Sequence, residues 1–174
     1  PERFFAKAKG FSHMHQTGTG EIRVYYNYAV VTPLYGDLRE ISEDIADEHA
    51  EPGYYTATLA QSNIKAEITV NENAAYHRYF FNGEGKLLID FSNDGLDRSL
   101  GEGAYDFARD AKITVESDNE ISAAVTLHGV RMYFYAVCDG AVKNAALFKD
   151  YVLCGGKELY QDNTKKRFGG VCIV

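Results

Sequence analysis

An apolar side chain occupies every second position of the stretch Ile64-Lys65-Ala66-Glu67-Ile68-Thr69-Val70. The same alternation recurs over residues 121–127, which read Ile-Ser-Ala-Ala-Val-Thr-Leu. Successive side chains of an extended strand point to opposite faces, so one face of each stretch can pack on a core while the other meets water. The two stretches therefore predict β-strands that are buried on one side.

Further segments share this alternation or a high content of aromatic and β-branched residues, which favours strands. They are residues 24–31, 54–60, 76–81, 86–91, 112–116, 132–137, 147–153 and 171–174. Short Gly-, Asn- and Asp-rich turns separate many of them, which is typical of an antiparallel meander. A single sheet with one buried face does not accommodate so many strands. Two sheets that face each other do, because each covers the apolar face of the other. We therefore expect an all-β fold, an antiparallel two-sheet β-sandwich of the supersandwich kind with little helix.

Helical spacing is found only over residues 38–48, where Leu38, Ile41 and Ile45 could line one side of a short helix, and an acidic loop is the alternative. No repeat, low-complexity tract or linker divides the 174 residues, which are about one domain in length. We expect a single domain over 1–174. The apolar run 171–174 is unusual for a terminus, which normally frays into polar sequence, and we expect a boundary within or beside a larger structure.

The charge balance excludes some partners. With 18 basic and 25 acidic residues, the formal charge is −7, which disfavours nucleic acid and anionic membranes as main partners. No apolar run is long enough to span a membrane. Cys138, Cys154 and Cys172 allow at most one disulfide, and their spacing favours three small buried hydrophobic side chains instead.

The densest group of side chains with binding chemistry is Ser12-His13-Met14-His15-Gln16-Thr17-Gly18-Thr19-Gly20. In an extended segment His13 and His15 point the same way, so they could bind a transition metal or donate to sugar hydroxyls. Zinc would need a third and a fourth ligand. His49, His77 and His128 are scattered and supply no obvious partner, so we assign no metal ligand. From the residues alone, a polar strand end is the simpler interpretation.

The carboxylates do not identify a catalytic pair. Asp90, Asp94 and Asp97 cluster near a predicted turn, but no spacing singles out two carboxylates of the kind that hydrolyse glycosides. No serine lies in a G-x-S-x-G elbow, and no cysteine lies in a nucleophile motif. We therefore assign no catalytic residue to this chain.

Five segments match, in order, the pattern of a known family. Residues 12–20 match S-H-T-H-x-x-G-T-G, residues 48–55 match E-x-A-x-P-G-Y-Y, and residues 66–69 match A-E-L-T. Residues 77–81 match H-R-Y-x-F, and residues 87–90 match an apolar strand that ends in Asp. Together they resemble the N-terminal domain of glycoside hydrolase family 92, the calcium-dependent exo-α-mannosidases. Met14 and Gln16 depart from the family's usual Thr and Leu.

The resemblance implies a two-domain inverting enzyme. An N-terminal β-sandwich packs on a C-terminal helical catalytic domain, with the active site between them. The general acid, the general base and Ca²⁺ belong mainly to the helical domain, so this chain alone is expected to hold no cofactor and to be inactive. We therefore make no enzyme assignment for this chain by itself. The resemblance implies that the longer parent protein is an inverting α-mannosidase.

The resemblance also favours a sugar-facing role for the histidine motif. Calcium takes oxygen ligands, so we expect His13, His15, Thr17 and Gly18 to bind substrate rather than metal. The expected partners are a mannose-containing glycan and the catalytic domain, and the expected location is secreted or periplasmic. A stand-alone carbohydrate-binding module with an aromatic platform and a purely structural domain are the alternatives.

Overall fold

The computed structural model describes residues 7–16, 26–92, 108–127, 130–140, 142–162 and 166–174. For residues 14–16, 26, 27 and 127 it describes the backbone only. This part of the chain forms fifteen β-strands and no helix. Consequently none of the described residues belongs to a helix long and apolar enough to cross a membrane.

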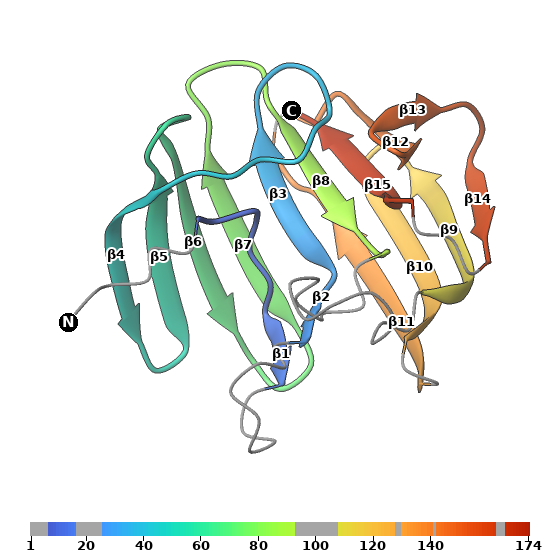
Figure 1. Ribbon diagram of the computed structural model, residues 1–174, viewed down its shortest axis with the longest axis horizontal. Helices are drawn as coiled ribbons and strands as arrows, with labels where there is room; N and C mark the ends of the chain where they lie inside the picture. Colours follow the sequence, from blue (N-terminus) through green and yellow to red (C-terminus); the bar gives the residue numbers. More distant parts are fainter. Residues whose placement is uncertain (1–6, 17–25, 93–107, 128–129, 141, 163–165) are drawn as a thin grey trace.

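Three antiparallel sheets and one small hairpin contain all of these strands (Figure 1). The meander sheet joins β4 (Ile45–Glu51), β5 (Tyr54–Leu59), β6 (Ile64–Val70) and β7 (Ala75–Phe80) in chain order. The outer sheet has the order β11 (Val130–Val137), β10 (Glu120–Leu127), β9 (Arg109–Ser117) and β14 (Glu158–Gln161). The central sheet has the order β13 (Val152–Cys154), β12 (Asn144–Lys149), β15 (Phe168–Ile173), β8 (Lys86–Asp90) and β3 (Val30–Leu34). The hairpin pairs β1 (Met14–Gln16) with β2 (Tyr26–Tyr28).

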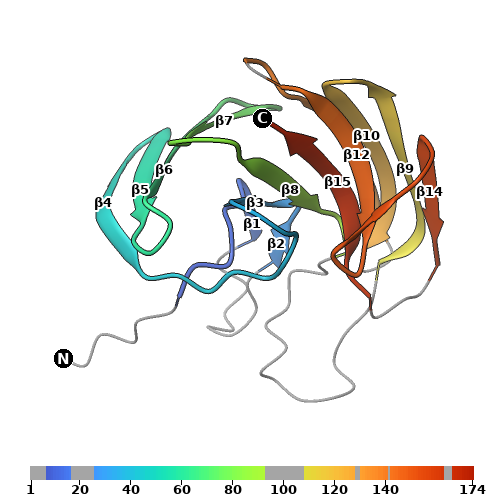
Figure 2. The same ribbon diagram turned by 90° about the horizontal axis from the view of Figure 1, so that it is seen from above.

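The central sheet lies between the other two, so the sandwich has three layers (Figure 2). Alternate residues of β15 show this directly. Phe168 and Cys172 belong to a core shared with the outer sheet, whereas Val171 belongs to a second core shared with the meander sheet. A strand that is buried on both faces reads as a continuous apolar run rather than an alternating one. The apolar run near residue 171 is therefore explained by its place in the middle of the central sheet.

Two glycines of β15 allow this close packing. A Cβ atom at Gly169 would collide with the backbone carbonyl oxygen of Ile89 and would lie 2.9 Å from Phe148 Cε1. A Cβ atom at Gly170 would lie 2.6 Å from Ile121 Cδ1, on the side of the outer sheet. The absence of side chains at these two positions lets β15 approach its neighbours in both layers.

The structure confirms the all-β antiparallel sandwich and corrects it in two respects. It has three sheets rather than the two expected. The predicted helix over 38–48 is wrong, because Ile41 is buried without helical structure and Ile45 begins β4. A β-bulge between Ala46 and His49 and a positive φ of 49° at Asp47 break the two-residue period there. The bulge follows Leu38, Ile41 and Ile45, and Leu38 and Ile41 lie in the irregular segment before β4.

Candidate functional site

The segment before β1 is tied to the central sheet. The backbone N–H groups of Phe11 and Val31 each donate to the other's carbonyl oxygen at 2.8 Å. The Ser12 hydroxyl donates to the carbonyl oxygen of Tyr28 at 2.7 Å. These bonds fix the backbone at Phe11 and Ser12. The next residue, the exposed His13, then lies beside the meander sheet.

His13 meets a second histidine, on β7. Its Nδ1 lies 3.0 Å from Nε2 of His77, and the two rings meet edge to face with centroids 5.1 Å apart. The other ring nitrogen of His77, Nδ1, lies 2.9 Å from the Tyr79 hydroxyl. His77 and Tyr79 are two positions apart on one strand, so they share a face of the meander sheet. The result is a hydrogen-bonded chain of three side chains that joins two layers of the sandwich.

Burial decides the charge of the middle member. Desolvation, with a smaller contribution from the neighbouring His13, lowers the pKa of His77 to about 4. Burial also raises the pKa of the Tyr79 hydroxyl. Both groups are therefore neutral near pH 7, and they act as neutral hydrogen-bonding partners in this chain of side chains.

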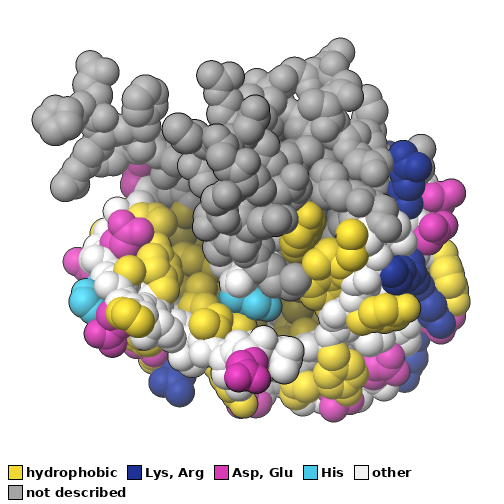
Figure 3. Space-filling view, turned by 90° about the horizontal axis from the view of Figure 1, so that it is seen from below, with side chains coloured by type: hydrophobic (Ala, Val, Ile, Leu, Met, Phe, Trp, Pro, Cys, Tyr) yellow, Lys and Arg dark blue, Asp and Glu magenta, His cyan; other side chains and the backbone are white. Residues whose placement is uncertain are grey.

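Aromatic rings hold this chain in place. The ring of Phe11 lies 6.0 Å from the ring of Tyr79 and 6.4 Å from that of Tyr55, measured between centroids. The Tyr55 hydroxyl donates to Glu48 Oε1 at 3.0 Å. Seen from below, this side of the molecule is hollowed, with hydrophobic side chains along the walls and histidine atoms inside (Figure 3). A hollow with apolar walls and a few polar groups has the composition of a ligand site.

The predicted site residues are only partly described. His13 lies in the cluster as given above, and the backbone of His15 pairs with that of Asn27 in the hairpin. Thr17 and Gly18 lie outside the described residues. The expectation that His77 has no partner is wrong. The spacing of His77 and Tyr79 indicates that they share a face of one strand, but it does not indicate that His13 lies opposite.

The described carboxylates near the predicted turn have structural partners. Asp90 is buried, and its Oδ2 lies 3.2 Å from the guanidinium of Arg167, while its Oδ1 accepts from the backbone N–H of Ser92 at 2.8 Å. Glu67 pairs with Arg78, its cross-strand neighbour on β7, at 3.6 Å. Asp94 and Asp97 lie outside the described residues.

No group of three or more His, Cys, Asp or Glu side chains gathers closely enough to hold a metal ion within the described part of the chain. The described residues thus supply no donor set that can be tested against Ca²⁺. No chemical step is assigned to a metal in this chain.

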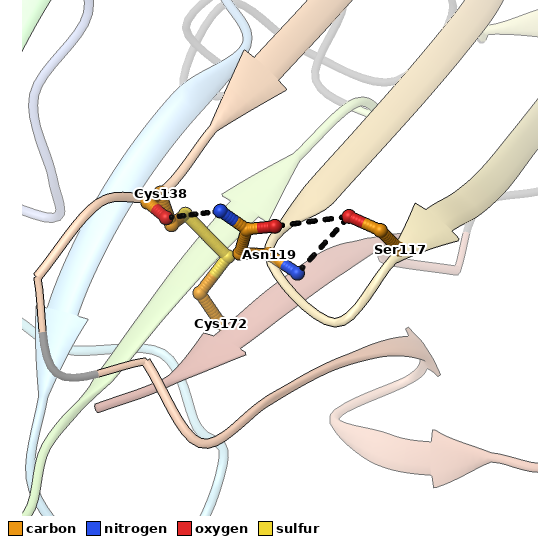
Figure 4. The surroundings of a disulfide bond; sticks show 4 residues. All are labelled: Ser117, Asn119, Cys138 and Cys172. Atoms are coloured by element: carbon orange, nitrogen blue, oxygen red, sulfur yellow. Dashed lines mark hydrogen bonds between the residues drawn. A yellow bond between two sulfur atoms is a disulfide. The ribbon is translucent and has the colours of Figure 1, made fainter.

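The cysteines are not all unpaired, contrary to the sequence-based preference. Cys138, directly after β11, forms a disulfide with Cys172 of β15 (Figure 4). Next to it, the Asn119 side-chain amide donates to the carbonyl oxygen of Cys138 at 3.1 Å, and the Cys138 N–H donates to the Asn119 carbonyl oxygen at 2.9 Å. Ser117 Oγ in turn donates to Asn119 Oδ1 at 2.9 Å. The disulfide therefore links the outer sheet to the central sheet, and Cys154 stays free.

The fold and the site together define an all-β antiparallel sandwich with a histidine–tyrosine cluster at one hollowed side. A model of the glycosyl hydrolase family 92 N-terminal domain matches residues 5–171. The chain belongs to this family. The resemblance inferred from five short motifs is thereby confirmed over almost the whole chain.

Individual relatives are similar over different shares of their length. An uncharacterised secreted glycosidase of Arthroderma benhamiae is 38% identical over an alignment 96 positions long, which covers 46% of this chain and 12% of the relative. The solved family 92 α-mannosidase of Bacteroides thetaiotaomicron has the same fold over 98% of this chain, with a TM-score of 0.73 and 17% identity. A second structure of that enzyme, in complex with mannoimidazole, matches with the same score over 99% of this chain. This chain spans 27% and 26% of those two chains, about a quarter of the enzyme.

Proposed function

We propose that this chain is the N-terminal accessory domain of an exo-acting α-mannosidase-like glycoside hydrolase. It shapes part of the glycan pocket and packs on a C-terminal helical catalytic domain. Family membership supports the association with glycoside hydrolysis. The observation that carries the proposal is the hydrogen-bonded chain of His13, His77 and Tyr79, which the ring of Phe11 contacts.

The chemistry of this cluster suits a sugar. Imidazole and hydroxyl groups donate to and accept from sugar hydroxyls, and apolar walls suit the C–H faces of a sugar ring. His13, His15, Thr17 and Gly18 are the proposed substrate-binding residues of this chain. The resemblance to family 92 implies that the general acid, the general base and the Ca²⁺ of the parent enzyme belong to the catalytic domain. In this chain Asp90 and Glu67 are held in ion pairs.

We also propose that the parent protein is secreted or periplasmic. Disulfides form and persist in oxidising compartments, and Cys138 and Cys172 are linked here. The Arthroderma relative is described as a secreted glycosidase. Both observations support the same location.

The proposal is tested by titrating the chain with mannose and α-linked mannobiose while recording amide NMR spectra. We expect shifts to cluster around His13–Gly20 and β7 and to be lost in His13→Ala and His15→Ala. His49→Ala is the matched control, because His49 is an exposed histidine on β4, away from the cluster. Shifts that survive both variants would contradict the assignment. An assay for α-mannoside hydrolysis with Ca²⁺ runs beside it, and turnover by this chain alone would place a complete acid–base pair within it.

A second candidate is a carbohydrate-binding module that uses the outer sheet. Tyr133, Tyr135 and Tyr160 are 77%, 62% and 60% exposed on its two edge strands. Lys112 Nζ lies 5.4 Å from the centroid of the Tyr160 ring and is paired with Glu158. The tyrosine rings are exposed, and the neighbouring charges of Lys112 and Glu158 neutralise each other. Such a surface suits an uncharged ligand that stacks on aromatic rings. In the same titration, shifts confined to these tyrosines and lost in Tyr133→Ala would favour this function over the first.

A further inference from the structure

We propose that His77, held by Tyr79, is a positioning residue that sets which ring nitrogen of His13 carries the proton. This inference rests on the proposed glycan-binding role of His13. It assigns a defined task to two residues that the histidine motif does not contain.

The direction of the hydrogen bonds follows from the donors available. A neutral imidazole has one N–H donor and one acceptor nitrogen, whereas a tyrosine hydroxyl can donate once. If the Tyr79 hydroxyl donates to His77 Nδ1, then His77 carries its proton on Nε2 and donates to His13 Nδ1. His13 must then carry its own proton on Nε2. In the reverse direction the O–H of the half-buried Tyr79 would need another acceptor, and no described side chain other than His77 bonds it.

Sheet pairing holds the two positioning groups rigidly. The backbone of His77 pairs with Ile68 and that of Tyr79 with Ala66, so β6 fixes both residues in register. Burial keeps His77 neutral and hence able to accept from Tyr79. The donor that His77 presents to His13 is therefore set by the sheet and not by the loop that carries His13.

The contacts among Phe11, Tyr79, His77 and His13 form a closed ring. Phe11, two residues before His13, packs on the ring of Tyr79. Tyr79 bonds His77, His77 bonds His13, and the backbone returns from His13 to Phe11. A ring of contacts of this kind restrains both the position and the rotation of the His13 imidazole. Packing alone would restrain the position only.

The direct test is nitrogen-15 NMR of the histidine rings in the 174-residue chain at pH 7. We expect His13 Nδ1 to be unprotonated, His13 Nε2 to be protonated, and a nitrogen–nitrogen coupling to join His77 Nε2 to His13 Nδ1 through the hydrogen bond. A proton on His13 Nδ1, or no coupling between these nitrogens, would overturn the proposal. This measurement needs no sugar.

Three variants separate positioning from packing. Tyr79→Phe keeps the ring that contacts Phe11 but removes the donor, so we expect the coupling to disappear while the chain stays folded. His77→Phe removes the donor to His13, and we expect mannobiose to bind about 3- to 10-fold more weakly, as for the loss of one hydrogen bond. In His77→Gln the side-chain amide can still donate, and we expect most of the affinity to return.

Failure of this inference is distinguishable from failure of the proposed function. If the coupling is present but mannobiose does not bind, the positioning chain stands and the glycan role of His13 fails. If mannobiose binds with unchanged affinity in both Tyr79→Phe and His77→Phe, the glycan site stands and the positioning role fails.

Discussion

His77 shows how one half-buried side chain can make the stability of a sandwich sensitive to acid. Its pKa falls from an ordinary value of 6.5 to about 4 in the folded protein, mainly because burial disfavours the charged ring. The unfolded chain therefore binds more protons than the folded chain between these two values. Stability contributed by the neutral ring is fully present above about pH 6.5 and is lost as the pH falls toward 4.

We expect the free energy of unfolding to fall by about 1–3 kcal/mol between pH 7 and pH 4.5 through this residue. Urea denaturation at a series of pH values measures it, and His77→Gln should remove most of the slope. The titratable groups in contact with His77 are His13 and Tyr79. The carboxyl of Glu67, whose pKa Lys65 holds below 4.5, loses its contribution only below that pH. An equal slope in His77→Gln would assign the effect to other groups.

The buried ion pair between Asp90 and Arg167 also contributes to stability. Replacing Asp90 by Ala leaves the mostly buried guanidinium of Arg167 without its carboxylate and the Ser92 N–H without its acceptor. We expect a loss of about 3–5 kcal/mol, the usual result of breaking a buried ion pair from one side. Glu84→Ala is the control, because Glu84 and Lys143 form an exposed pair that should matter little. Similar urea midpoints for the two variants would argue against this ranking.

The residues of the site were only partly predictable from the sequence. The motif around His13 stands out because its polar side chains are adjacent in the chain. The partner of His13 does not, since His77 lies 64 residues away. A two-residue period reveals which face of a strand a side chain occupies, but it does not reveal what lies opposite. The pairing of Cys138 with Cys172 is hidden for the same reason.

At the scale of elements, prediction succeeded where the period of two is unbroken. Residues 64–70 and 121–127 alternate regularly, and the strands predicted there are present as β6 and β10. Strand prediction failed at β4, where the bulge after Ala46 interrupts the two-residue alternation. It also failed at β1 and β13, because strands of three residues are too short to show an alternation. The third layer was missed because its middle strand, β15, is apolar on both faces and gives no alternation.

The glycines of β15 test this middle position. We expect Gly170→Ala to lower the free energy of unfolding by about 1–3 kcal/mol, since Ile121 must move to admit the methyl group. Gly169→Ala should cost more, because the obstacle is the backbone of Ile89, which cannot rotate away. Gly155→Ala is the matched control, with no atom within 4 Å of the added carbon. Thermal or urea unfolding of the three variants measures the order, and equal stability of all three would contradict the packing described here.

At the scale of the whole molecule, the disulfide is a covalent link between the outer sheet and the central sheet. Cys138 and Cys172 are 34 residues apart, and closing a loop of that length stabilises a protein by about 3–4 kcal/mol in the chain-entropy model. We expect the double variant Cys138→Ala, Cys172→Ala to lose about this much in urea denaturation. Cys154→Ala is the control for loss of a thiol. An unchanged midpoint after reduction of the unmodified chain would mean that the bond contributes nothing.

The position of β15 also has a consequence for biosynthesis. The meander sheet is local in sequence and can pair as soon as residue 80 has left the ribosome, because its four strands follow one another. The central sheet cannot, since β8 and β12 are joined only through β15. Until residues 168–173 emerge, both apolar surfaces that this strand covers stay open to water and to other nascent chains. Such an intermediate is the kind of species that needs a chaperone.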